Sequence, residues 1–207
     1  MSSKKSRRAV QAAETQQLIL EAALKLFSSR GYGATSVADI AEEAGVAVPT
    51  VYASVGPKTA VLRRLLDWMD ERADVPELAR RLMASTDPAE ILNIQVTIAR
   101  QLSERCGDVL AALASAAQVD TEMAKLYADG VARHRAGARK TTERLAAQGA
   151  LRDGLPAERA AAMIATLTLP AVWTELHRHF GWSFAEVEDW IVGTLSDRLF
   201  GTAPPAR

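Results

Sequence analysis

Three positions near the N-terminus restrict the fold of this 207-residue chain more than any other feature. Ala41 is a small residue, Gly45 follows it after four positions, and Val51 comes six positions later. This spacing predicts two short helices that cross at a tight turn. The small residue allows the helices to approach, the glycine forms the turn, and the aliphatic side chain packs against the first helix. Such a helix-turn-helix unit typically places its second helix in the major groove of DNA.

The residues around this unit predict further helices with recognisable ends. Gly31 is suited to end a first helix, because glycine accepts the backbone conformation that often follows a helix. Ser36 and Asp39 match the capping-box pattern at the start of the second helix. Pro49 is tolerated in the first turn of the third. We expect the four N-terminal helices at about residues 10–29, 37–44, 48–54 and 58–73.

Helical patterns continue to the C-terminus, and no segment alternates apolar and polar residues for long. We expect interruptions at Asp74–Pro76 and at Gly107, and a bend at Pro170, whose ring removes a backbone donor. Ser183 and Glu186 repeat the capping-box pattern. The remaining helices are expected at about residues 87–105, 109–117, 121–148, 157–180 and 184–200. The predicted fold class is therefore all-α, with about nine helices.

Composition argues against several classes of protein. Apolar residues make up 48% of the chain, which is enough for a core, but no run of about 18 apolar residues suggests a membrane span. Cys106 is the single cysteine, so an internal disulfide and a cysteine-based zinc site are excluded. His177 and His179 are two residues apart and would point to different sides of a helix. We expect a cytoplasmic protein without enzymatic activity, cofactor or metal.

The segments LFSSRGYGATSVADIAEEAGV and TVY, with the lysine after Gly56-Pro57, resemble the N-terminal signature of the TetR family of transcriptional regulators. The resemblance covers Ala12 to Leu66 in order and spacing, and beyond Arg72 only the helical layout is similar. It implies a DNA-binding domain over residues 1–58, with a basic arm and a three-helix helix-turn-helix domain. It also implies an effector-binding and dimerisation domain over residues 59–203 and a tail over residues 204–207.

The resemblance also implies a set of DNA contacts. Hydroxyls at the start of the second helix and the lysine that opens the fourth helix contact phosphates in members of the family. The first turn of the third helix approaches base edges, and the tyrosine of the T-x-Y motif contacts the DNA backbone. Apart from the resemblance, Ala53 is small enough to let the DNA backbone come close. The expected residues here are Thr35, Ser36, Val48, Pro49, Thr50, Tyr52, Ala53 and Lys58. Val48 and Pro49 can contact only apolar features of DNA, above all a thymine methyl.

Some positions depart from the family pattern. Ala47 stands where many members have serine, so the third helix lacks the usual side-chain cap, worth about 1 kcal/mol. Ser54 and Val55 replace an aromatic pair that is common in the family. No Arg, Asn or Gln lies between Val46 and Gly56, so strong bidentate contacts to bases are not expected from this helix. These departures leave open a small-molecule binding protein of the same fold that does not bind DNA.

Four cations, Lys4, Lys5, Arg7 and Arg8, precede the first acidic residue, Glu14. Two interpretations remain open. A basic arm ahead of a helix-turn-helix can neutralise phosphates, whereas short basic tails also serve only to keep a protein in solution.

The C-terminal helices are expected to bind the two other predicted partners, a small-molecule effector and a second copy of the chain. An effector pocket rich in methionine would suit varied hydrophobic ligands, and the residues we expect there are Trp68, Met69, Ile94, Ile98, Met123, Tyr127, Met163 and Leu167. Large apolar residues near the C-terminus suggest a two-fold interface between copies, with Trp173, Trp190 and Leu195 as candidates. The predicted function is a homodimeric, ligand-responsive regulator, most simply a repressor, released from an inverted-repeat operator on double-stranded DNA by a small hydrophobic effector.

Overall fold

The computed structural model describes the backbone of residues 2–200 and the side chains of residues 10–69 and 72–200. Over residues 2–200 the chain consists of helices joined by short connections, which confirms the predicted all-α class. None of the helices in this range is long and apolar enough to cross a membrane. The predicted tail over residues 204–207 lies outside the described residues.

The chain divides into two compact units. The first comprises residues 1–69 and 108–127, and the second comprises residues 70–107 and 128–207. The long helices α6 (Pro88–Ala116) and α7 (Thr121–Ala147) therefore contribute to both units. The division differs from the predicted domain boundary at residue 58, because the N-terminal helices share their core with residues distant in sequence.

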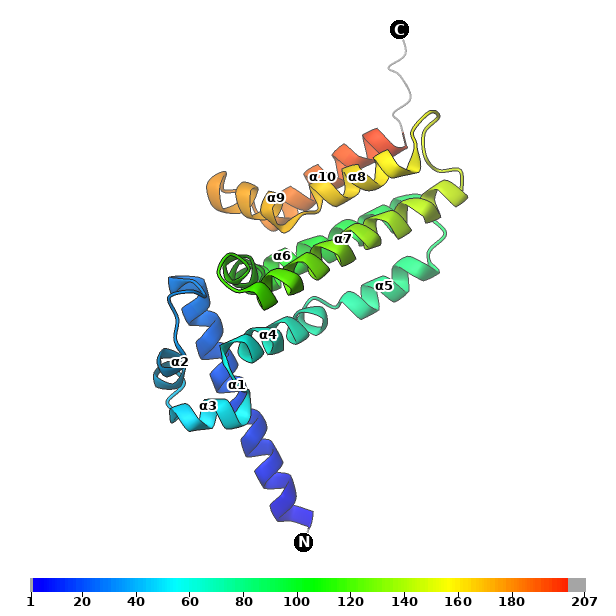
Figure 1. The fold of residues 1–207 in the computed structure, drawn as a ribbon. Helices are drawn as coiled ribbons and strands as arrows, with labels where there is room; N and C mark the ends of the chain where they lie inside the picture. The colour runs from blue at the N-terminus through cyan, green and yellow to red at the C-terminus, as the bar shows by residue number, and fades with distance from the viewer. Residues whose placement is uncertain (1, 201–207) are drawn as a thin grey trace. The chain divides into compact units, whose positions relative to one another are not determined.

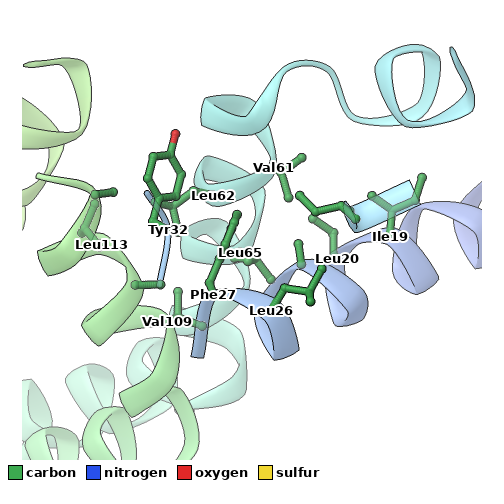
Figure 2. Close-up of a cluster of buried hydrophobic side chains, with 14 of the residues drawn as sticks. Ile19, Leu20, Leu26, Phe27, Tyr32, Val61, Leu62, Leu65, Val109 and Leu113 are labelled. Carbon is green, nitrogen blue, oxygen red and sulfur yellow. The ribbon is translucent and has the colours of Figure 1, made fainter. Parts of the chain in front are cut away.

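The first unit begins with α1 (Ser2–Arg30), against which α2 (Val37–Glu43) and α3 (Val48–Ser54) pack (Figure 1). The helix expected from residue 10 thus starts at residue 2. Within the helix α4 (Lys58–Arg72), Leu65 lies beside Phe27 of α1 and Val109 of α6 in the same apolar cluster (Figure 2). The aromatic rings of Phe27 and Tyr32 have centroids 5.2 Å apart. This shared core holds the base of the helix-turn-helix.

The second unit contains α5 (Val75–Ala84), α8 (Ala157–Leu167), α9 (Pro170–Thr174), a π-helical segment η1 (Glu175–His179) and α10 (Phe184–Leu199). Its larger core surrounds Trp173, which clusters with Ile164 of α8 and Ile191 of α10. A smaller core joins Leu78 of α5 to Leu145 of α7. The unit is thus a helical body with two apolar centres.

The C-terminal helices differ from the sequence prediction in two places. Helix α5 was not predicted, although Pro76 lies in its first turn and Leu78 is buried. The break expected at Gly107 is wrong, since α6 continues through it. A glycine within a helix costs about 1 kcal/mol, and burial of the neighbouring Cys106 and Val109 outweighs this cost. The bend expected at Pro170 is confirmed as the break between α8 and α9.

Candidate nucleic-acid interface

The turn between α2 and α3 has the geometry that the spacing predicts. Gly45 adopts a φ of 67°, a left-handed conformation that favours glycine. The amide of Val46 donates to the carbonyl of Ala41 at 2.9 Å, which closes the turn. Ala41 and Val51 are both buried, so the two helices meet through their small and aliphatic residues. The inner side of the unit is therefore fixed by packing.

The outer side of α3 is open. The side chains of Tyr52 and Val48 are 53% and 37% exposed, and Pro49 and Ala53 are exposed as well. Thr50 is half-buried. Helix α3 has no side-chain cap, as expected from alanine at its N-cap. Five of the predicted DNA-contacting residues thus share one short helix whose outward surface carries no charge.

Ser36 forms the predicted capping box at the start of α2. Its hydroxyl accepts a hydrogen bond from the amide of Asp39 at 3.1 Å and donates to the Asp39 carboxylate at 2.6 Å. The amide of Ser36 also donates to that carboxylate at 2.7 Å. These bonds from Ser36 hold the pKa of Asp39 below its ordinary value. Ser36 is exposed, but its hydroxyl proton is already engaged.

Thr35 is placed differently from the expectation. Its side chain is 1% exposed, and its hydroxyl donates to the carbonyl of Gly31 at 2.9 Å. The hydroxyl therefore stabilises the loop between α1 and α2 from inside. A phosphate contact from the Thr35 side chain is inconsistent with this burial. Two adjacent hydroxyl residues cannot be distinguished by pattern alone, so the burial of Thr35 beside the exposed Ser36 was not predictable.

Lys58 also makes internal contacts rather than extending into solvent. Its ammonium donates to the carbonyl of Tyr32 at 2.9 Å and to the carbonyl of Thr35 at 2.8 Å. The same nitrogen lies 4.2 Å from the centroid of the Tyr32 ring, within range of a cation–π contact. Burial lowers the pKa of Lys58, while the charge of Asp120 opposes that shift. The expected phosphate contact would have to compete with these contacts for the ammonium.

Tyr32 lies in the loop that Lys58 contacts, and its side chain is buried. Burial, followed by the charges of Asp120 and Glu122, raises the pKa of Tyr32 to about 12. Glu122 forms an ion pair with Arg63 of α4 at 2.5 Å. The start of α7 therefore presents acids to the loop and to α4. Sequence reasoning missed this arrangement, because the partners are separated by about 60 residues or more.

Acidic side chains occupy another side of the unit. A hollow beside α1 and α2 is lined by Leu26, Arg30, Asp39, Glu42 and Glu43. Lys25 of α1 pairs with Glu43 at 2.5 Å, a link that the sequence did not reveal. Carboxylates repel phosphates. The uncharged outer side of α3 is therefore the better surface for DNA.

The residues predicted to line an effector pocket do not form one group. Trp68 and Met69 pack against the core of the first unit, where Met123 is fully buried, and Tyr127 is exposed. The other four belong to the second unit, where Ile94 and Ile98 join the smaller core and Met163 and Leu167 pack against the larger one. Helical spacing identifies inward-facing residues but not which of several cores receives them.

Two of the three predicted interface residues are internal. Trp173 and Leu195 are both 0% exposed in the single chain, so neither lies on a surface available to a second copy. Their large apolar side chains indicated burial, and they are buried in the core of the single chain. Trp190 is 41% exposed and packs edge-on against Trp182, with ring centroids 6.0 Å apart. Phe180, 66% exposed, was not among the interface candidates.

Two further features of the second unit bear on ligand binding. The indole nitrogen of Trp173 and the hydroxyl of Ser103 are buried without a hydrogen-bond partner among the described residues. His134 contacts the carbonyl of Ala165 at 2.9 Å and lies 3.5 Å from the hydroxyl of Thr168. Buried polar groups normally have hydrogen-bond partners, so the nitrogen of Trp173 and the hydroxyl of Ser103 are candidates to contact a ligand.

Comparison with known proteins places this geometry in context. Residues 19–65 match the family described as bacterial regulatory proteins, tetR family. The chain is 32% identical over 114 residues to the uncharacterized HTH-type transcriptional regulator YdeS of Bacillus subtilis, covering 55% of this chain and 54% of that protein. It is 43% identical over 53 residues to the HTH-type transcriptional repressor ComR of Escherichia coli, covering 26% and 25% of the two chains. The chain thus matches about half the length of YdeS and a quarter of ComR.

Solved structures resemble the chain over more of its length. NalD, the secondary repressor of the MexAB-OprM multidrug efflux pump in Pseudomonas aeruginosa, has a TM-score of 0.72 at 19% identity and covers 92% of this chain and 98% of its own. The transcriptional regulator FadR of Bacillus subtilis, in complex with stearoyl-CoA, has a TM-score of 0.70 at 17% identity, covering 90% and 99%. At these identities the likeness concerns the fold.

Proposed function

Since the chain belongs to the TetR family of helix-turn-helix regulators, we propose that it binds double-stranded DNA and regulates transcription. The observation that carries this proposal is the contrast across α3. Val51 is buried in the core with residues of α2, whereas Tyr52 and Val48 of the same helix are exposed. A helix fixed on one side and open on the other is suited to lie in a major groove.

DNA recognition by one short helix is weak, so we propose a homodimer that binds an inverted repeat. Two recognition helices about 34–36 Å apart would enter successive major grooves. The aromatic residues Phe180 and Trp190 offer exposed apolar surface in the second unit, and of the three predicted interface residues Trp190 is the one that remains a candidate. Likeness to NalD and ComR, both described as repressors, favours repression over activation.

We propose that a small hydrophobic effector binds the second unit and releases the DNA. The buried, unpartnered nitrogen of Trp173 supports this, because a ligand oxygen would satisfy it. His134 and Thr168 add polar groups at the break after α8. The complex of FadR with stearoyl-CoA shows that a protein of this fold holds an acyl ligand. An effector with an apolar body and one acceptor would suit these groups.

Selection from double-stranded DNA with a random core tests DNA binding directly. The core should be long enough for two half-sites one helical turn apart. We expect enrichment of an inverted repeat, and sedimentation of the enriched complex should give two protein chains per DNA. A protein that enriches no sequence at low salt would instead be the alternative, a small-molecule binding protein of the same fold.

A further inference from the structure

The outward face of α3 carries apolar side chains and no charged or amide group, and from this we propose that the protein recognises its operator through the C5-methyl groups of thymine. The inference rests on the proposed DNA binding and adds to it the base feature that is recognised. Specificity would come from apolar contact rather than from hydrogen bonds between side chains and bases.

The four exposed residues of α3 form one continuous stripe. Val48 and Tyr52 are one helical turn apart, and so are Pro49 and Ala53, so the two pairs lie side by side on the helix surface. Val51 lies outside this stripe and is buried. The stripe is therefore the part of α3 that enters a groove if the buried side stays packed.

The chemistry of the major groove limits what such a stripe can read. Guanine presents two acceptors, cytosine a donor, adenine an acceptor and a donor, and thymine an acceptor with a methyl group. The strongest side-chain partners are Arg or Lys for guanine, Asn or Gln for adenine, and Asp or Glu for cytosine. Residues 46–56 contain none of these six residue types. The thymine methyl is the one base feature that aliphatic side chains contact favourably.

The stripe also discriminates against other bases. Pressing the side chains of Val48 and Pro49 against a guanine or cytosine edge removes water from polar atoms without giving them a partner, which is costly. Pro49 lacks a backbone N–H, and the amide of Thr50 already donates to the carbonyl of Ala47 at 2.8 Å. The backbone at the start of α3 therefore does little to offset that cost.

Lys58 does not provide the missing base contact. Its ammonium is engaged with the carbonyls of Tyr32 and Thr35, so the nearest cation that follows α3 in sequence is directed inward. The hydroxyl of Tyr52 remains, and it suits a phosphate or a single base acceptor. Contact with the thymine methyl is thus the means by which the side chains of Val48, Pro49 and Ala53 would recognise a base.

Replacement of thymine by uracil tests the proposal, because uracil keeps every hydrogen-bonding atom and lacks the methyl. Two random-core DNA libraries, one copied with thymidine triphosphate and one with deoxyuridine triphosphate, are offered to the full chain. The sequence enriched from the thymine library is then synthesised with uracil at one thymine at a time. Affinities are measured by fluorescence anisotropy for the full chain, for Val48→Ala and for Met83→Ala.

We expect enrichment from the thymine library and loss of that sequence from the uracil library. At one or more thymines of each half-site, uracil should weaken binding roughly fourfold, the factor for about 0.8 kcal/mol per buried methyl. Val48→Ala should reduce this penalty at the thymine that Val48 contacts, because the two changes remove the same contact. Met83, an exposed apolar residue of the second unit, is the control, and Met83→Ala should leave every penalty unchanged.

The outcomes separate this proposal from the proposed function. Enrichment of the same sequence from both libraries would overturn methyl recognition and leave DNA binding intact. Uracil penalties that Val48→Ala leaves unchanged would also overturn it. If neither library yields an enriched sequence, DNA recognition itself fails, and the methyl proposal fails with it.

Discussion

The substitution Lys58→Met distinguishes a lysine that supports the fold from one that binds phosphate. Methionine keeps the length and apolar stem of lysine but removes the ammonium. The change deletes the hydrogen bonds at 2.9 Å and 2.8 Å to the carbonyls of Tyr32 and Thr35, and with them the cation–π contact with the Tyr32 ring. The loop between α1 and α2 would then lose its attachment to the start of α4.

The expected cost follows from these contacts. Hydrogen bonds from a charged donor contribute about 1.5 kcal/mol each at the low end of their range, and a partly exposed cation–π contact adds about 0.5 kcal/mol. Relief from burying the ammonium, which the lowered pKa of Lys58 reflects, offsets part of that sum. The carbonyl of Tyr32 also keeps the amide of Thr35 as a donor at 3.3 Å. We therefore expect a loss of about 2 kcal/mol.

Thermal unfolding followed by circular dichroism measures the effect. A loss of about 2 kcal/mol should lower the Tm by roughly 4–8 °C in a chain of this size. Arg64→Met, which removes an exposed cation from the same helix, is the matched control and should leave the Tm nearly unchanged. DNA affinity should fall for Lys58→Met, but the slope of log affinity against log salt should stay the same. An unchanged Tm with a slope reduced by about 0.9 would refute the reasoning and restore a phosphate contact.

Four other predictions concern a capping-box carboxylate, the two sides of α3, a contact between α6 and α10, and the N-terminal cations. The pKa of Asp39 is lowered in the folded chain, so the stability that its carboxylate contributes is present above its ordinary pKa of 3.8 and is lost as the pH falls through the folded pKa. Between about pH 5 and pH 3, the free energy of unfolding in urea should therefore fall less for Asp39→Asn than for the unchanged chain. Val51→Ala should destabilise the buried side of α3 by roughly 2 kcal/mol, whereas Val48→Ala on its exposed side should change stability by less than about 0.5 kcal/mol. Glu188→Gln should cost about 1 kcal/mol in urea unfolding, since its carboxylate accepts bonds from α6 at 2.8 Å. Replacing the four cations of residues 4–8 by glutamine should reduce the salt slope of DNA binding by up to roughly 3.6, and an unchanged slope would identify them as a solubilising tail.

Local signals in the sequence predicted the helix-turn-helix well. The capping box of Ser36 and Asp39 and the one that opens α10 are both formed, and α3 has the expected bounds. These features depend on residues within four positions of one another. The small and aliphatic residues at Ala41 and Val51 pack as predicted, because the crossing of two short helices leaves few alternatives.

Contacts between distant segments were not predictable in the same way. Lys58 reaches a loop 23 to 26 residues earlier, and Arg63 reaches Glu122 across 59 residues. Apolar periodicity identified Trp173 and Leu195 as large buried residues but did not show whether the chain or a second copy buries them. Helix α6 passes Gly107 because packing of its neighbours exceeds a propensity cost of about 1 kcal/mol.

Because Lys58 is held by internal contacts, attraction to DNA at long range and recognition of bases would come from different residues of the first unit. A recognition helix without charge gives little attraction for DNA at long range, and attraction from phosphates dominates affinity. With Lys58 held by the loop between α1 and α2, that attraction must come from cations elsewhere, whereas α3 supplies shape and apolar contact. Base preference and salt dependence would then be set by different residues. A substitution on the stripe of α3 should change which sequence is bound without changing the salt slope, and substitution of the N-terminal cations should do the reverse.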